Sequence, residues 1–277
     1  MSKKVIIIGS GIAGISSSLK LKSYGINSII LDKGNFIGGR ISTKEVEIGS
    51  SSSYFFHGAQ FFTAKTKNFK KIVEQGIKND FIKEFGNFNP PRFRGHKTMR
   101  EFLTKLTVNL NIQQNKKIIS IKPGQKGINV LSENIKAWQN FDAVISTIPS
   151  PQNFSLMENF PELRKTLDTS SYDSCIALMF SFDETPINIP IYFDFYNKKG
   201  ILSWMACGSN VNLWTAHTKG SYANKNLNQN KDQLKKEILL AIQKALSKFQ
   251  NISEINFHSL QDRKSTRLNS SHRCISY

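Results

Sequence analysis

The stretch VIIIGSGIAG, residues 5–14, decides the fold of this chain, because it joins an apolar run to a glycine-rich turn. Val5–Ile8 predicts a buried β-strand, and the glycines after it have the spacing G-x-G-x-x-G at the start of a helix expected to reach Tyr24. A second apolar run, Ser28–Leu31, ends at Asp32. This order of strand, helix, strand and acid is typical of a dinucleotide-binding βαβ unit.

The residue types in this unit each have a physical reason. Gly9 permits a tight turn, Gly11 lets the backbone approach a pyrophosphate, and Gly14 lets the helix pack closely on the strand. The pyrophosphate is expected on the N–H groups of the helix start, with a ribose on Asp32. A chance glycine turn is disfavoured by the strand and helix around it. The cofactor-binding residues predicted here are Gly9, Ser10, Gly11, Ile12, Ala13, Gly14, Asp32 and Lys33.

Gly38, Gly39 and Arg40 follow Asp32, and their spacing from it helps to distinguish a site for FAD from a site for NAD. The arrangement resembles the continuation found in FAD-dependent amine-oxidase-like flavoproteins, which plain NAD dehydrogenases do not usually carry. A guanidinium at this point could pair with the pyrophosphate, for which its fixed fork is suited. We therefore expect FAD as the cofactor, bound also by Gly38, Gly39 and Arg40, and regard an NAD-dependent dehydrogenase as the disfavoured alternative.

The chain is strongly basic, with 38 Lys and Arg against 20 Asp and Glu and a net charge of +18. The excess is mainly lysine spread along the chain, without a basic helix or an RNP motif, so we expect no nucleic-acid partner. No apolar run approaches the ~20 residues that span a membrane, and the apolar start is interrupted by glycines. Cys175 and Cys207 do not have the spacing of metal ligands, so we expect no metal site. Two ordinary thiols and the lack of a targeting signal predict a protein of the reducing cytoplasm.

The last sixteen residues differ from the rest of the chain. Residues 262–272 read DRKSTRLNSSH, which back-translates to a common short-read sequencing adapter. We expect residues 262–277 to be an adapter-derived tail on a C-terminally truncated chain and to pack on neither lobe. A genuine basic tail is the alternative.

The remaining pattern predicts an α/β fold, with a Rossmann-like FAD-binding lobe and a β-rich substrate lobe. Residues 141–148, FDAVISTI, form a buried strand of the first lobe, and apolar residues at helical spacing follow residue 97. Later segments alternate as sheet strands before one helical stripe at 234–249. The expected domains are residues 1–62 and 108–149 for the FAD-binding lobe, 63–107 for a helical insertion, and 150–261 for the substrate lobe.

A family resemblance joins these features. The resemblance depends on the glycine-rich stretch, the FFHGAQFFTA segment at 55–64, residues 141–149, and Trp204, Trp214 and His217. In these residues the chain resembles renalase-like FAD-dependent oxidoreductases. The resemblance implies a noncovalent FAD with the HGAQ segment beside the flavin ring, although Phe56 stands where the family usually has an acid. It implies further cofactor contacts from Gly58, Ala59, Gln60, Ile118, Thr147 and Pro149.

The expected function is FAD-dependent oxidation of a small reduced substrate, a dihydronicotinamide isomer or an amine, by hydride transfer to flavin with oxygen as the final acceptor. His57 is the candidate catalytic residue, with a structural histidine as the alternative. The competing functions are a non-catalytic flavin- or nucleotide-binding protein and an inactive truncated fragment. The sequence gives neither the oligomeric state nor the substrate identity.

Overall fold

The computed structural model describes residues 3–48, 50–134, 136–167, 172–186, 188–249, 254–267 and 275–276, the stretches 262–267 and 275–276 as backbone alone. The chain divides into two compact units. The first unit comprises residues 1–40 and 100–171, and the second comprises 41–99 and 172–277.

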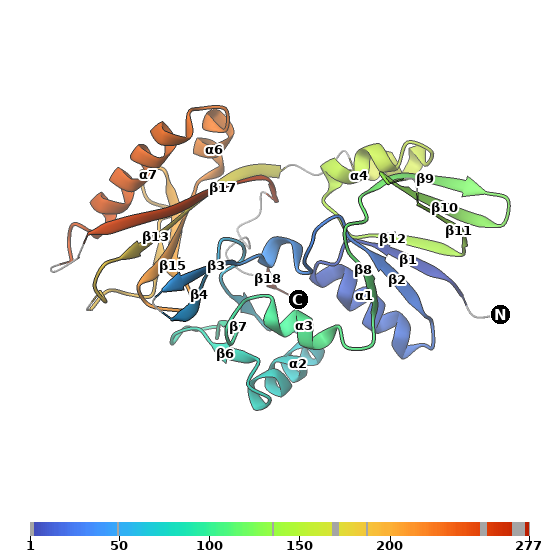
Figure 1. Ribbon diagram of the computed structural model, residues 1–277, viewed down its shortest axis with the longest axis horizontal. Coiled ribbons are helices and arrows are strands. Elements are labelled where there is room, and N and C mark those ends of the chain that lie inside the picture. Colours follow the sequence, from blue (N-terminus) through green and yellow to red (C-terminus); the bar gives the residue numbers. More distant parts are fainter. Residues whose placement is uncertain are drawn as a thin grey trace. The chain divides into compact units, whose positions relative to one another are not determined.

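The first unit is built on a parallel sheet with strand order β12-β1-β2-β8 (Figure 1). Ile8 at the end of β1 lies between Leu31 of β2 and Ser146 of β12, which confirms the predicted βαβ unit. Of the strand predicted as buried at 141–148, only residues 143–146 form β12, and they are half-buried because β12 is an edge strand of this sheet. All four residues of β1 are buried, as a continuous apolar run in a central parallel strand should be. The elements are β1 (Val5–Ile8), α1 (Ile12–Ser23), β2 (Ser28–Leu31), β8 (Asn111–Gln113) and β12 (Ala143–Ser146).

A second sheet of the first unit packs on one side of this core. It has the antiparallel order β11-β10-β9 and contributes Ile121, Val130 and Trp138 to a cluster with Ile6 and Leu31. The remaining elements are the 3-10 turn η1 (Gly39–Ile41), α3 (Glu101–Leu106), β9 (Ile118–Gly124), β10 (Gly127–Ser132), β11 (Ala137–Phe141), α4 (Ser150–Leu156) and α5 (Pro161–Leu167).

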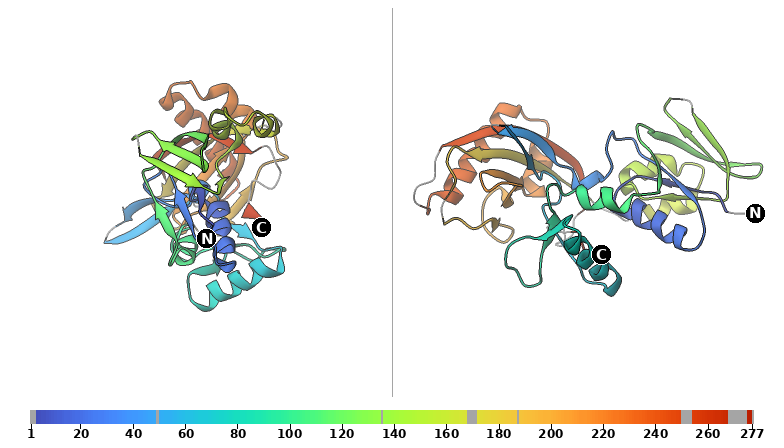
Figure 2. Two further views of the ribbon diagram at one scale, coloured as in Figure 1. Left: turned by 90° about the vertical axis from the view of Figure 1, so that its right-hand side faces the viewer. Right: turned by 60° about the horizontal axis from the view of Figure 1, so that its bottom comes forward.

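The second unit is centred on an antiparallel sheet with strand order β14-β15-β16-β13-β17. Helices α6 and α7 lie along one face of this sheet (Figure 2), and the stripe Leu234, Ile238 and Ile242 packs there against Phe180 and Trp214. The elements are β13 (Tyr172–Phe182), β14 (Tyr192–Asp194), β15 (Leu202–Cys207), β16 (Leu213–Thr218), α6 (Gly220–Asn226), α7 (Lys231–Leu246) and β17 (Ile255–Arg267).

Residues 41–99 also belong to this second unit. Phe55 packs against Met179 of β13 and Leu213 of β16, which alternate with the residues that face α7, so it covers the opposite face of the sheet. The elements are β3 (Lys44–Ile48), β4 (Ser51–Phe55), β5 (Phe62–Thr63), α2 (Lys67–Lys78), β6 (Ile82–Glu84) and β7 (Phe93–Gly95).

The unit boundaries differ from the expected domains in three places. Residues 41–62 group with the second unit because Phe55 is buried against its sheet. Residues 150–171 group with the first unit, where Leu156 of α4 packs in the cluster around Ile6. The segment 63–107 contains strands β6 and β7 as well as helices, so it is not a purely helical insertion.

The expectation that residues 262–277 pack on neither lobe is wrong for part of this segment. Strand β17 runs antiparallel to β13 as far as Arg267, which lies opposite Tyr172, and β18 (Ile275–Ser276) pairs with β5. The physical reason is that a strand ladder uses backbone N–H and C=O groups, which every residue except proline supplies. Residues 268–274 and 277 lie outside the described residues.

Candidate functional site

The glycine-rich turn lies at the carboxyl ends of β1 and β2, where dinucleotides bind in open parallel sheets. The Gly9 amide donates to the Leu31 carbonyl at 2.8 Å, and the Gly38 amide donates to the Ser10 carbonyl at 3.0 Å. Gly11 is the N-cap of α1, and the first turn of this helix carries no acidic residue. The turn therefore presents a helix N-terminus that attracts an anion.

The three fingerprint glycines have different steric reasons. A Cβ on Gly14 would lie 1.9 Å from the Gly9 carbonyl oxygen, so a larger residue cannot fit without moving the backbone. Gly9 has a φ of +102°, and its Cβ would lie 2.8 Å from the Thr147 hydroxyl. A Cβ on Gly11 would meet nothing within 4 Å. Space for a ligand therefore lies directly over Gly11, as expected for a backbone that a pyrophosphate approaches closely.

Asp32 lies beside this turn and is held by three hydrogen bonds. Its Oδ2 accepts from the Ser10 amide at 2.6 Å and from the Ser10 hydroxyl at 2.8 Å, while its Oδ1 accepts from the Gly34 amide at 2.7 Å. A carboxylate has about four acceptor positions, so Asp32 orders the turn and keeps limited capacity for a ribose. This structural role was not predicted from the sequence.

Only some of the other predicted cofactor residues of the first unit border the glycine turn. The Thr147 hydroxyl donates to the Ile8 carbonyl at 2.9 Å, and a Cβ on Gly39 would lie 3.8 Å from Gly11, so both residues border the turn. Ile118 is instead a buried core residue, and the Lys33 ammonium donates to Gln152 at 3.3 Å. Within this unit Ile12 and Ala13 begin α1, Pro149 is the N-cap of α4, and Arg40 is exposed.

The HGAQ segment lies in the second unit, along β16. The His217 ring nitrogen Nε2 lies 3.2 Å from the His57 carbonyl oxygen, and the Gln60 side-chain amide donates to the Thr215 carbonyl at 3.2 Å. The Gly58 amide donates to the Ser42 carbonyl at 3.2 Å. These bonds fix residues 57–60 beside the strand, with Gly58 buried and His57 and Ala59 half-buried.

Several side-chain polar atoms are buried near this segment. Gln60 Oε1, Thr215 Oγ1 and Trp204 Nε1 have no hydrogen-bond partner among the described residues. His217, whose ring centroid lies 4.6 Å from that of Trp204, belongs to the same strand as Thr215. Because buried polar atoms in folded proteins are nearly always hydrogen-bonded, each of these three atoms is a candidate partner for a water molecule or a ligand.

Thr215 was not among the residues predicted from the sequence, and Gln60 was predicted only through the family resemblance. The alternation L-W-T-A-H-T at 213–218 could have indicated Thr215, because Thr215 and His217 are polar positions on one side of a fully buried strand.

Among the described residues, no group of three or more potential ligands could hold a metal ion. No helix in the same part of the chain is long and apolar enough to cross a membrane.

Known proteins resemble this chain in two ways. The sequence model of one protein family, the NAD(P)-binding Rossmann-like domain, matches residues 7–75 of this chain. The 4,4'-diaponeurosporene oxygenase of Staphylococcus haemolyticus (strain JCSC1435) is 44% identical over 45 residues, which are 16% of this chain and 9% of that protein. The sequence similarity to this curated relative therefore covers only a small part of its length.

The structural similarity covers nearly the whole chain. A reduced UDP-galactopyranose mutase matches with a TM-score of 0.71 and 12% identity, over 96% of this chain and 83% of that chain. A CLA-producing fatty acid isomerase from P. acnes matches with a TM-score of 0.66 and 10% identity, over 92% and 86% of the two chains. The chain therefore shares the fold of these solved proteins, which combines a Rossmann-like part with β-rich sheets.

Proposed function

We propose that this protein is an FAD-dependent oxidoreductase that oxidises a small reduced substrate. The observation that carries the proposal is the glycine turn, where Gly9 and Gly14 are sterically required while the space over Gly11 is open. When bound, FAD would accept the hydride from the substrate. Oxygen would then oxidise the reduced flavin, with release of hydrogen peroxide.

The residues around the turn fit the adenosine diphosphate half of FAD. The amides that follow Gly11 at the start of α1 would donate to the pyrophosphate, where the helix dipole favours negative charge. Asp32 would accept from the ribose with its remaining capacity while holding Ser10. Arg40 follows Gly38 and Gly39, and its presence in the sequence supports FAD over NAD because the amine-oxidase-like flavoproteins carry it.

The buried polar atoms of the second unit support a small substrate with both donors and acceptors. Trp204 Nε1 can donate, Gln60 Oε1 can accept, and the Thr215 hydroxyl can do either. A carboxamide, as in a dihydronicotinamide isomer, matches this pattern better than an isolated amine does. His57 is proposed to orient the substrate; its carbonyl bond with His217 fixes the backbone at that position.

The test separates cofactor binding from turnover. Gly11→Asp places a carboxylate in the open space over the turn, and Ser16→Asp places the same charge on an exposed position of the same helix. In flavin fluorescence titrations, we expect Gly11→Asp to bind FAD at least tenfold more weakly than both the parent chain and Ser16→Asp do.

Reduced nicotinamide isomers and amines are then mixed anaerobically with the FAD-loaded protein, and bleaching of the flavin is followed. Bleaching that reverses with oxygen supports the oxidoreductase. Binding of FAD without bleaching by any candidate favours the non-catalytic flavin-binding alternative, and equal FAD binding by both variants would remove the cofactor assignment.

A further inference from the structure

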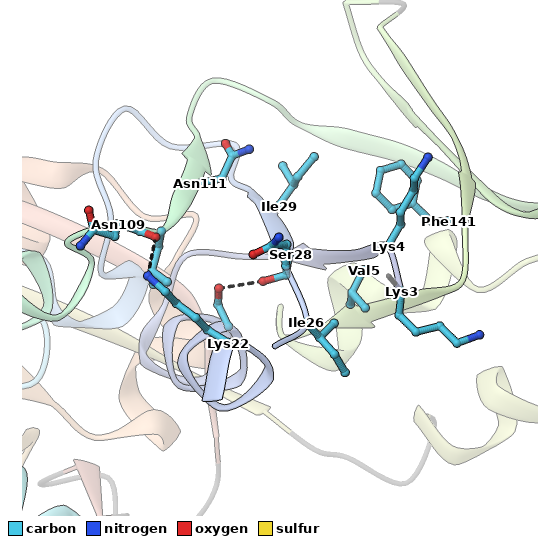
Figure 3. A pocket seen from close by; sticks show the side chains of 13 residues that line it. Lys3, Lys4, Val5, Lys22, Ile26, Ser28, Ile29, Asn109, Asn111 and Phe141 are labelled. Carbon is cyan, nitrogen blue, oxygen red and sulfur yellow. Dashed lines mark hydrogen bonds between the residues drawn. The ribbon is translucent and has the colours of Figure 1, made fainter. Parts of the chain in front are cut away.

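A cavity of about 560 Å³ lies in the first unit, away from the glycine turn (Figure 3). It is lined by Lys4, Asn27 and Leu110, which immediately precede β1, β2 and β8. These strands are parallel, so the cavity lies at their amino ends while the glycine turn follows their carboxyl ends. The cavity is therefore separate from the place where this type of sheet binds a dinucleotide.

The wall of the cavity is basic and contains no acidic side chain. Its neutral polar groups are hydroxyls and carboxamides, and its apolar residues come from the strands and the loop after α1. Figure 3 shows Lys22 with Asn109 and Asn111 on one side of the cavity and Lys3, Lys4 and Phe141 on the other, with Ser28 and Ile29 between them. The remaining lining residues are Val5, Ser18, Ile26, Asn27 and Leu110.

The charges of this wall are only partly compensated. Lys3 pairs with Asp142 at 3.2 Å, and the Lys22 ammonium donates to the Asn109 carbonyl at 3.1 Å. Within the described part of the chain, the side chains of Lys4 and Lys22 form no ion pair with an acid. The lining of the cavity therefore carries two ammonium groups, those of Lys4 and Lys22, that no acid of the described residues neutralises.

We propose that this cavity binds an organic phosphate monoester that carries a planar ring. Lysine ammonium groups bind phosphate as point charges, and the carboxamides can donate to its remaining oxygens or to the edge of the ring. Ile26 and Ile29 are partly exposed and offer an apolar surface for the ring. Small-molecule sites combine such apolar surface with a few polar groups that fix orientation.

The binding test uses phenyl phosphate as the probe and isothermal titration calorimetry on the full chain. We expect phenyl phosphate to bind at least tenfold more tightly than inorganic phosphate or phenol, because each of these lacks one half of the recognised chemistry. Lys22→Gln should weaken binding by about tenfold, the value of one charged hydrogen bond. Lys20→Gln is the matched control: it removes the same charge from α1, but its side chain lies over Tyr24 and does not line the cavity.

The glycine turn could also bind phosphate, so Gly11→Asp is titrated in parallel. Retained binding of phenyl phosphate by this variant supports the cavity, and lost binding would assign the probe to the turn and overturn the proposal. Absence of measurable binding by the parent chain would overturn it as well. Equal weakening by Lys22→Gln and Lys20→Gln would reduce the effect to the general basic charge of the chain.

Discussion

Replacement of two fingerprint glycines by alanine should separate folding from cofactor binding. In Gly14→Ala the new Cβ would lie 1.9 Å from the Gly9 carbonyl oxygen and 3.1 Å from its carbonyl carbon, so α1 and the β1 turn must move apart. No flexible side chain can relieve this contact with backbone. We expect a cost of about 3 kcal/mol, the upper end for overpacking. At roughly 2–4 °C per kcal/mol, the midpoint of thermal unfolding should fall by roughly 6–12 °C.

In Gly11→Ala the new Cβ meets nothing within 4 Å, so the unfolding midpoint should change by no more than about 2 °C, as for a mild N-cap change. FAD affinity should nevertheless fall at least tenfold, about 1.4 kcal/mol, because the methyl occupies the side from which the pyrophosphate approaches. Circular dichroism gives the midpoints and flavin fluorescence titration gives the affinities. A parent-like midpoint for Gly14→Ala, or unchanged FAD affinity for Gly11→Ala, would refute this reasoning.

Three further changes test other parts of the molecule. Asp32→Ala should weaken FAD binding more than His57→Ala in a titration of both variants, because it releases the buried Ser10 as well as a ribose acceptor; equal affinities would contradict the assignment. Arg94→Met should lower the free energy of unfolding by about 2–4 kcal/mol in urea titrations, since the buried guanidinium donates to two carbonyls, and Arg94→Lys should restore only part of it. Burial, with a smaller effect of a nearby lysine, lowers the pKa of His258, so thermal stability should decrease below about pH 6.5 and His258→Gln should reduce that decrease.

The βαβ unit could be predicted from the sequence because its determinants are local. Val5–Ile8, the three glycines and Asp32 lie within 28 residues, and each conforms to a rule about strand ends, turns or helix starts. The threonine that fixes the turn is different. Thr147 is more than 130 residues away along the chain, and it reaches the Ile8 carbonyl only because β12 pairs with β1. Only the family resemblance placed it near the cofactor.

The unit boundaries could not be predicted because they depend on long-range packing. Phe55 belongs to the second unit through contacts with Met179 and Leu213, which no pattern within residues 41–62 specifies. The strand at 262–267 was not predicted, because its residue composition favours a tail that packs on neither lobe. Its pairing with β13 uses backbone groups, so an unusual residue composition does not prevent it.

The two candidate regions differ in what their chemistry requires of the sequence. At the glycine turn, backbone amides would hold the proposed cofactor, and the feature that this requires is the lack of a side chain on Gly11. In the second unit, specificity would come from side-chain atoms of Gln60, Thr215 and Trp204. A mutase and an isomerase share the fold, and the fold therefore does not select net oxidation. If the proposed function is correct, these three buried atoms decide which substrate binds, and substrate-dependent bleaching of the flavin in Gln60→Leu and Thr215→Val is the measurement that tests this.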